Sequence, residues 1–269
     1  MARILHTLSV LPLLVRLYVK SEMEYRGAFL LDRVAQIVNY SAGYAAIWIL
    51  LLKFDTLGGW TWPELAALLA FGLLTYSLGA AFSFVQMREL EDFIQRGQFD
   101  VLMVKPFSPW AFIVFSRLNI HYAGHIALAV PLLVWALVQV DVAWSVGLVL
   151  YLVVAVLSAI MVVASTMTII GACAFVLVRS RYLYSAFFGF WELARYPLNI
   201  FPAPIQWVMF TVIPLGFMNY VPVAWLIGKP VPILGDAAGP LSLVAGPICV
   251  ALAWAHWTWS IRRYQGGGG

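Results

Sequence analysis

The uncharged run Ser145–Val176 constrains the fold of this chain more than any other feature. An α-helix rises 1.5 Å per residue, so about 20 apolar residues cross the hydrocarbon core of a bilayer. The run is longer than that, and we predict a membrane-spanning helix that tilts, breaks or projects from the bilayer. Composition extends this to the whole chain, because 63% of its residues are hydrophobic and only 10% are charged. Soluble domains carry about 25% charge, so we predict an all-α integral membrane protein.

Other apolar segments recur along the 269 residues, which leave room for roughly six spans and for no large soluble domain. We therefore predict a single transmembrane domain over residues 1–269, with six transmembrane helices. The predicted spans are Val34–Leu52, Leu65–Val85, a helix within Ile113–Val140, Ser145–Val176, Tyr182–Phe201 and Leu241–Trp259.

Two further segments are interrupted too often to span. Residues 1–33 combine a short apolar run with charges, so we expect a retained, uncleaved helix that lies in the cytoplasmic interface. Residues 202–238 contain six prolines, each of which removes a backbone donor and breaks a straight helix. We expect two short helices there that enter and leave the outer leaflet without crossing, as a re-entrant extracytoplasmic hairpin.

The positions of lysine and arginine orient the predicted spans. Six spans put both termini on one side, and that side then receives 13 of the 16 basic residues. Only Lys53, Arg195 and Lys229 fall on the other side. Basic residues gather on cytoplasmic loops, so we expect both termini to be cytoplasmic. The same rule accounts for the net charge of +4 without a nucleic-acid partner.

Residues 87–109, here called the charged segment, form the predicted cytoplasmic loop between the second and third spans. An apolar stripe at i, i+3 and i+4 predicts a short amphipathic helix; it consists of Leu90, Phe93 and Ile94. The other faces of that helix hold acidic residues, namely Glu89, Glu91 and Asp92.

The second half of the charged segment is predicted to be another short helix. Gly97 is a natural helix stop, and Asp100 is placed to cap a following turn that ends near Pro106. Loops that bind lipid are mainly basic, whereas this one is mixed in charge. We therefore interpret the charged segment as a docking surface for a protein partner.

Two pairs of metal-binding residue types have simpler interpretations. His121 and His125 share a helix face at a spacing that can bind a metal, but no local acidic residue or cysteine accompanies them. We therefore expect helix–helix hydrogen bonding and no metal site. Cys173 and Cys249 lie in apolar runs and are expected to be small buried side chains.

One charged pair falls inside a predicted span. Glu192 and Arg195 lie at i, i+3, and an intramembrane pair of this kind is either functional or holds the neighbouring broken helices in place. The residues show no nucleophile–base pair for an intramembrane enzyme, and we predict no catalytic residue. The phosphate-binding motif G-x-x-x-x-G-K-[ST] does not occur in the sequence, so any ATP must be bound by another chain.

The order of several motifs resembles ABC-2-type permeases, the membrane subunits of ABC exporters. In the charged segment these positions are Glu89, Leu90, Ile94, Gly97, Asp100, Leu102 and Pro106. The resemblance continues in Glu24-Tyr25-Arg26, in ARYPLNIFP at 194–202, in VIPLGFMNYVP at 212–222 and in the final RYQGGGG. It covers essentially the whole chain and is greatest to a poorly characterised branch of chains of this length.

The resemblance implies an interfacial N-terminal helix, six spans, two re-entrant helices before the last span and a cytoplasmic coupling helix. That helix would dock on an ATPase subunit through Glu89, Glu91, Asp92 and Arg96, with Leu90, Phe93 and Ile94 packing at the interface. Gly97 and Asp100 would also belong to the contact. The complex would contain two permeases, identical or paralogous, and two ATPase subunits that hold ATP and Mg. It would lie in a bacterial inner membrane and export a hydrophobic or amphipathic drug, peptide or lipid.

Two other functions remain open at this point. A secondary transporter driven by an ion gradient needs buried carboxylates in broken spans, and only Glu192 qualifies in this sequence. A non-transporting scaffold or immunity protein is the second, although the proline-rich hairpin is more than a scaffold requires.

Overall fold

The computed structural model describes Arg16, Lys20 and residues 26–105, 108–116, 122–177 and 179–264. Across these ranges the chain is built from helices and loops without a β-strand, which confirms the predicted all-α class. The predicted interfacial helix over residues 1–33 lies mostly outside the described residues. From Arg26 onward, that segment is the start of helix α2 (Arg26–Phe54).

Four helices in the described part of the chain are long and apolar enough to cross a membrane. They are α2 (Arg26–Phe54), α3 (Trp62–Gln95), α7 (Val146–Ala172, extended to Phe175 by a 3-10 turn) and α11 (Ala238–Ile261). The predicted third span is divided between α5 (Pro109–Ser116) and the shorter apolar helix α6 (Ala123–Gln139). The predicted count of six spans therefore stays a prediction, since five are counted at most, and only if the bent pair α9–α10 is taken as one span.

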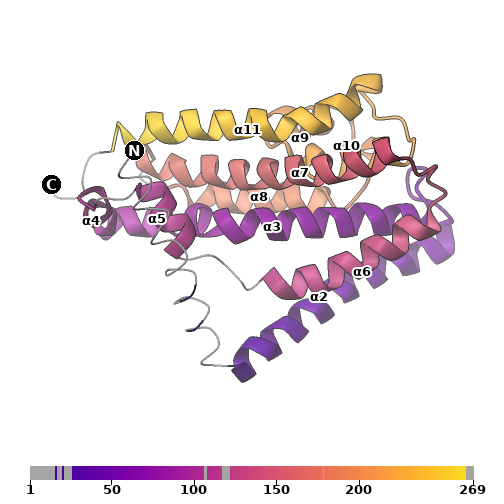
Figure 1. Cartoon of the computed structure of the whole chain (residues 1–269), viewed down its shortest axis with the longest axis horizontal. Coiled ribbons are helices and arrows are strands. Elements are labelled where there is room, and N and C mark those ends of the chain that lie inside the picture. Colours follow the sequence, from indigo (N-terminus) through magenta and orange to yellow (C-terminus); the bar gives the residue numbers. More distant parts are fainter. Residues whose placement is uncertain are drawn as a thin grey trace.

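The long helices form a bundle with two distinct ends, in which α3, α7 and α11 run in the same direction and α2 runs the opposite way (Figure 1). One end gathers the last turns of α3 and α11, the short helix α4 (Gln98–Met103) and the start of α8 (Arg181–Leu193). We call it the charged end, because Arg88 and Arg181 lie in these elements and Arg96 and Arg262 directly follow α3 and α11. The opposite, far end holds the turns between α2 and α3 and between α6 and α7.

Helix α3 forms the centre of the bundle, and 78% of its most apolar stretch is buried. Small residues allow the neighbouring helices to approach it and each other closely. A Cβ atom at Gly171 of α7 would lie 2.5 Å from the backbone oxygen of Gln86 in α3. A Cβ atom at Gly246 of α11 would collide with the backbone oxygen of Ser158 in α7. Glycine is therefore required where α7 meets both α3 and α11.

The charged segment differs from its predicted form in one respect. Helix α3 continues without interruption through Arg88 to Gln95, so the apolar stripe belongs to the last turns of a long helix. No separate short helix forms there, because nothing between Val85 and Gln95 breaks the helix. Gly97 ends it with a left-handed φ of +66°, and α4 follows as the predicted second short helix.

The proline-rich region (residues 202–238) contains short helices, as its prolines predict. Helix α8 ends at Leu193, earlier than the predicted Phe201, and a 3-10 turn over Leu198–Ile200 follows. Helix α9 (Ala203–Thr211) and the pair formed by η5 (Leu215–Phe217) and α10 (Tyr220–Leu226) then meet at a bend of 79°. Both lie in the half of the bundle away from the charged end (Figure 1).

Candidate functional site

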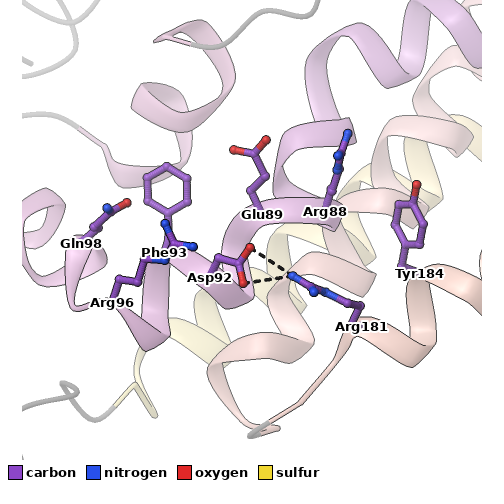
Figure 2. A pocket seen from close by; sticks show the side chains of 8 residues that line it. All are labelled: Arg88, Glu89, Asp92, Phe93, Arg96, Gln98, Arg181 and Tyr184. Carbon is purple, nitrogen blue, oxygen red and sulfur yellow. Dashed lines mark hydrogen bonds and ion pairs between the residues drawn. The ribbon is translucent and has the colours of Figure 1, made fainter.

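The charged segment borders an open depression of about 670 Å³ at the charged end of the bundle. Figure 2 shows that the last turns of α3 provide most of its wall, and that α8 closes the other side. The lining residues are Arg88, Glu89, Asp92, Phe93, Arg96, Gln98, Arg181 and Tyr184. Arginine and carboxylate side chains therefore alternate around one concave surface, which suits a protein partner of mixed charge.

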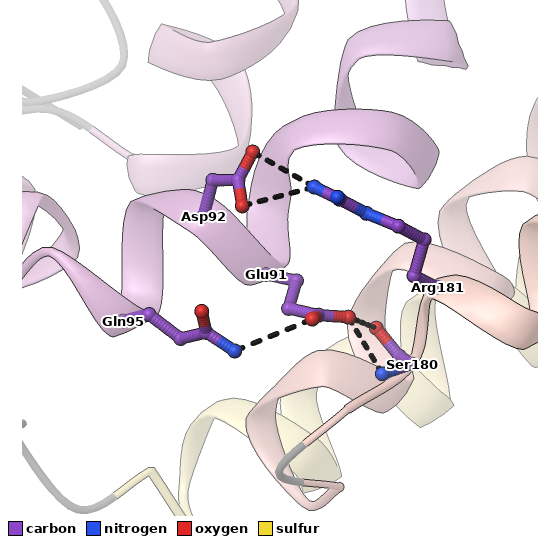
Figure 3. Close-up of polar contacts among 5 residues, drawn as sticks. All are labelled: Glu91, Asp92, Gln95, Ser180 and Arg181. Carbon is purple, nitrogen blue, oxygen red and sulfur yellow. Dashed lines mark hydrogen bonds and ion pairs between the residues drawn. The ribbon is translucent and has the colours of Figure 1, made fainter.

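Glu91 does not line this depression and instead bonds to the start of α8 (Figure 3). Its Oε2 atom accepts hydrogen bonds from the backbone N–H of Ser180, at 2.6 Å, and from the Ser180 hydroxyl, at 3.1 Å. Ser180 is the residue before α8 and has no side-chain cap of its own. The first N–H groups of a helix lack intrahelical acceptors and attract negative charge. Glu91 therefore caps α8 from another helix.

The environment of Glu91 favours its ionised form. Glu91 lies six residues beyond Val85, where the predicted second span ends, and so belongs to the charged end of α3. Partial burial raises the pKa of its carboxyl, but hydrogen bonds from Ser180 and the charge of Arg181 outweigh burial and leave the pKa below its usual value.

Asp92 makes the second contact between α3 and α8. The Nη2 atom of Arg181 donates to both carboxylate oxygens, at 3.0 and 3.1 Å. The side chains are 66% exposed for Arg181 and 38% for Asp92, so solvent screens this ion pair. We call the contacts of Glu91 with Ser180 and of Asp92 with Arg181 the α3–α8 link.

The apolar stripe of the charged segment packs inside this chain. Leu90 is only 1% exposed and belongs to a small core at the charged end. That core also contains Phe99, Leu102, Ile113, Phe175 and Trp257, and Phe93 and Ile94 pack against it. The expectation that Leu90 packs on a partner needs correction, because rings from α4, α11 and the end of α7 cover its side chain. Phe93 also lines the depression and retains a solvent-facing side.

Gly97 and Asp100 fix the turn that follows α3. The positive φ of Gly97 favours glycine. Asp100 was expected to cap the next helix, but Gly97 occupies the capping position and Asp100 lies in the first turn of α4. The Asp100 Oδ1 atom instead accepts a hydrogen bond of 2.9 Å from the hydroxyl of Tyr264, which follows α11. The charged segment is thereby held by α8 on one side and by the end of α11 on the other.

Sequence reasoning did not identify Ser180, Arg181 and Tyr264 as partners of the charged segment. Ser180 lies 89 residues from Glu91 and Tyr264 lies 164 from Asp100, so no local spacing connects them. One signal was available, because Arg179 and Arg181 form the basic loop predicted on the same side as the acidic helix. Opposite charges on two neighbouring loops predict contact.

Glu192 and Arg195 form the predicted pair at the end of α8. Arg195 Nη1 donates to Glu192 Oε2 at 2.8 Å, and the Glu192 side chain is 62% exposed. The Arg195 guanidinium packs directly on Gly43 of α2, where a Cβ atom would collide with it. Arg195 therefore connects the end of α8 with α2 beside the start of the proline-rich region.

Among the described residues, no three histidine, cysteine, aspartate or glutamate side chains come together as a metal site would require. His125 is buried against the rings of Tyr40 and Tyr122, with centroid distances of 4.6 and 5.2 Å. His121 lies outside the described residues. Cys173 and Cys249 are free thiols.

One comparison with known proteins gives a match. The model of the family described as ABC-2 family transporter protein matches residues 37–268, which includes all of the charged segment and the proline-rich region. No curated protein and no solved structure matches the chain.

Proposed function

Since the chain belongs to the ABC-2 family of transporter proteins and is a permease component of an ABC transporter, we propose that an ATPase subunit docks on its charged segment and drives export. The observation that carries this proposal is the continuity of α3. One helix of 34 residues joins the docking surface to the centre of the bundle. A force applied at Arg96 reaches buried α3 without crossing a flexible joint, since the first break is at Gly97.

The chemistry of the depression supports a folded protein as the docked partner. Arg88 and Arg96 are exposed and Glu89 lies between them on the wall. A partner with paired charges can contact both signs, whereas a surface built for anionic lipid would be mainly basic and would not include Glu89 and Asp92. ATP and Mg would be held by the docked subunit, because this chain has no phosphate-binding loop motif.

The assembled transporter would contain two ATPase subunits and a second permease, identical or paralogous. The charged end would face the cytoplasm of a bacterium, with both termini on that side of the inner membrane, because basic residues concentrate there. The apolar character of the chain favours a hydrophobic or amphipathic substrate such as a drug, peptide or lipid.

Purification from the native host tests the partner. A tagged copy in mild detergent should bring an ABC ATPase into the eluate, identified by mass spectrometry, and a second permease if the complex is heteromeric. Reproducible absence of an ATPase after crosslinking would contradict the proposal and favour a secondary transporter or a scaffold.

A charge-reversed variant locates the docking surface. Arg96→Glu should reduce ATPase recovery roughly tenfold, the effect of losing about 1.4 kcal/mol of binding free energy, because it places an acidic side chain on the wall of the depression. Arg262→Glu is the matched control, since Arg262 is also an exposed arginine at the charged end but lies outside the charged segment. Equal recovery with both variants, at equal membrane levels, would place docking elsewhere.

A further inference from the structure

A second hollow, distinct from the docking surface, lies on the side of the bundle. It is a groove of about 470 Å³ between α7, α8, α11 and the bend that follows α9. Its lining is almost entirely apolar and includes Ile169, Cys173, Ile213, Leu241, Ile248 and Leu252. Helix α11 lies alongside α7 and runs to the charged end (Figure 1). The groove therefore follows the direction of a lipid acyl chain.

The α11 wall of the groove is made of large apolar side chains. Val244, Ile248 and Leu252 are large exposed hydrophobic residues on the lipid-facing helix α11. Within a bilayer such a groove fills with hydrocarbon, because water there would lack polar partners.

The α11 face that lines the groove continues to a cation at the charged end. Ile248, Leu252 and His256 follow at i, i+4 and i+8, so they lie along one stripe of the helix. The Nε2 atom of His256 lies 3.7 Å from the sulfur of Cys173, a groove residue. The stripe is thus continuous with the groove floor.

Two more residues complete the stripe beyond His256. The indole of Trp259 stacks on the His256 ring at 5.9 Å and 24°. The guanidinium of Arg263 lies 4.1 Å from the Trp259 ring centroid. Tryptophan and arginine at the end of a spanning helix mark the level of the lipid headgroups. Arg263 is exposed, and its donors suit the planar recognition of a phosphate.

We propose that this groove binds one anionic phospholipid, with an acyl chain between α7 and α11 and the phosphate at Arg263. His256 and Trp259 form the transition from the apolar groove to the charged headgroup site. The lipid bridges α11, α7 and the bend after α9. The site is independent of ATPase docking, because it is made by this chain alone and lies on other residues.

Photolabelling in vesicles tests the site on the full-length chain. The probe is phosphatidylglycerol with a diazirine on one acyl chain, in vesicles of equal phosphatidylglycerol and phosphatidylcholine. Peptide mass spectrometry should find labels concentrated in α7 near Cys173 and in α11 between Ile248 and Leu252. Phosphatidylcholine with the same diazirine should label these peptides about fivefold less, the factor expected for one basic residue near an anionic headgroup.

Two matched pairs of variants separate the groove from the lipid belt around the protein. Ile248→Trp fills the groove and should remove the label, whereas Val250→Trp should not, since Val250 is exposed to a similar degree on α11 but does not line the groove. Arg263→Gln should lower labelling by phosphatidylglycerol about fivefold, and the neighbouring Arg262→Gln should not. The Arg263 pair concerns exposed residues, so it remains informative if a tryptophan variant fails to fold.

Three outcomes would overturn the proposal. These are labels spread evenly around the bundle, equal labelling by both lipids, and groove peptides crosslinked to a second protein instead of to lipid. The last would identify the groove as a protein interface.

Discussion

Replacement of Glu91 by alanine should destabilise the charged end more than any single change in the exposed ion pair beside it. The Glu91 carboxylate accepts from both the backbone N–H and the hydroxyl of Ser180, which is buried. Hydrogen bonds to a charged group contribute about 1.5–3 kcal/mol, and a buried donor without an acceptor is costly. Since Glu91 is partly exposed to water, we expect a loss of about 2 kcal/mol in the free energy of unfolding for Glu91→Ala.

Two other changes in the α3–α8 link should cost less stability than Glu91→Ala. Glu91→Gln keeps an acceptor oxygen and loses only the charge at the start of α8, which is worth about 0.3–1 kcal/mol. Asp92→Ala removes an exposed ion pair and should cost less than about 1 kcal/mol. The structure therefore predicts that the loss in the free energy of unfolding is largest for Glu91→Ala and smaller for Glu91→Gln and Asp92→Ala.

The assay is unfolding of the purified full-length chain by titration with dodecyl sulfate in mixed micelles, followed by tryptophan fluorescence. Gln95→Ala is the control, because Gln95 is exposed and its hydrogen bond to Glu91 is long, at 3.3 Å, so its loss should be small beside that of Glu91→Ala. A loss for Asp92→Ala equal to that for Glu91→Ala would refute the argument from burial. An unchanged unfolding midpoint for Glu91→Ala would also refute it.

Three further predictions use the same unfolding measurement. The pKa of Glu91 is lowered in the fold from a usual 4.5, so its stabilising effect is present above that pH and is lost as the pH falls through the folded pKa. The difference in the free energy of unfolding between wild type and Glu91→Gln should therefore be constant from about pH 7 to 5 and shrink at lower pH. A difference that grows on acidification would contradict this. Gly97→Ala should cost about 1 kcal/mol, because an L side chain disfavours its positive φ, and an unchanged stability would show that the turn is not required. Gly171→Ala should cost about 1–3 kcal/mol, because its Cβ would press on the Gln86 backbone and force α3 and α7 apart; a stabilised variant would exclude close packing there.

The sequence predicted the features that depend on local composition. Apolar runs are sufficient to locate α2, α7 and α11, because a bilayer requires about 20 apolar residues per helix. The prolines after residue 197 predicted short helices, since each forbids a straight helix at its position, and α9 and α10 confirm this.

The sequence did not predict features that depend on distant partners. The stripe of Leu90 has the same spacing whether it faces a partner or its own core, and only the positions of Phe175 and Trp257 decide between them. The end of α3 was misplaced for a related reason. Charged residues at Arg88 and Glu89 suggested a new element, but they are compatible with helix and merely mark where α3 leaves the apolar region.

The length of α3 and its link to α8 together restrict how the proposed docking surface can move. At 1.5 Å per residue, 34 residues extend about 51 Å, which exceeds a bilayer core of about 30 Å. The last turns of α3 carry the proposed docking surface, and Glu91 and Asp92 bind these turns to the start of α8. Rotation of α3 alone would break the buried contact with Ser180. A docked subunit that displaces the charged segment therefore has to move α3 and α8 together, and α8 leads directly to Arg195 and the proline-rich helices.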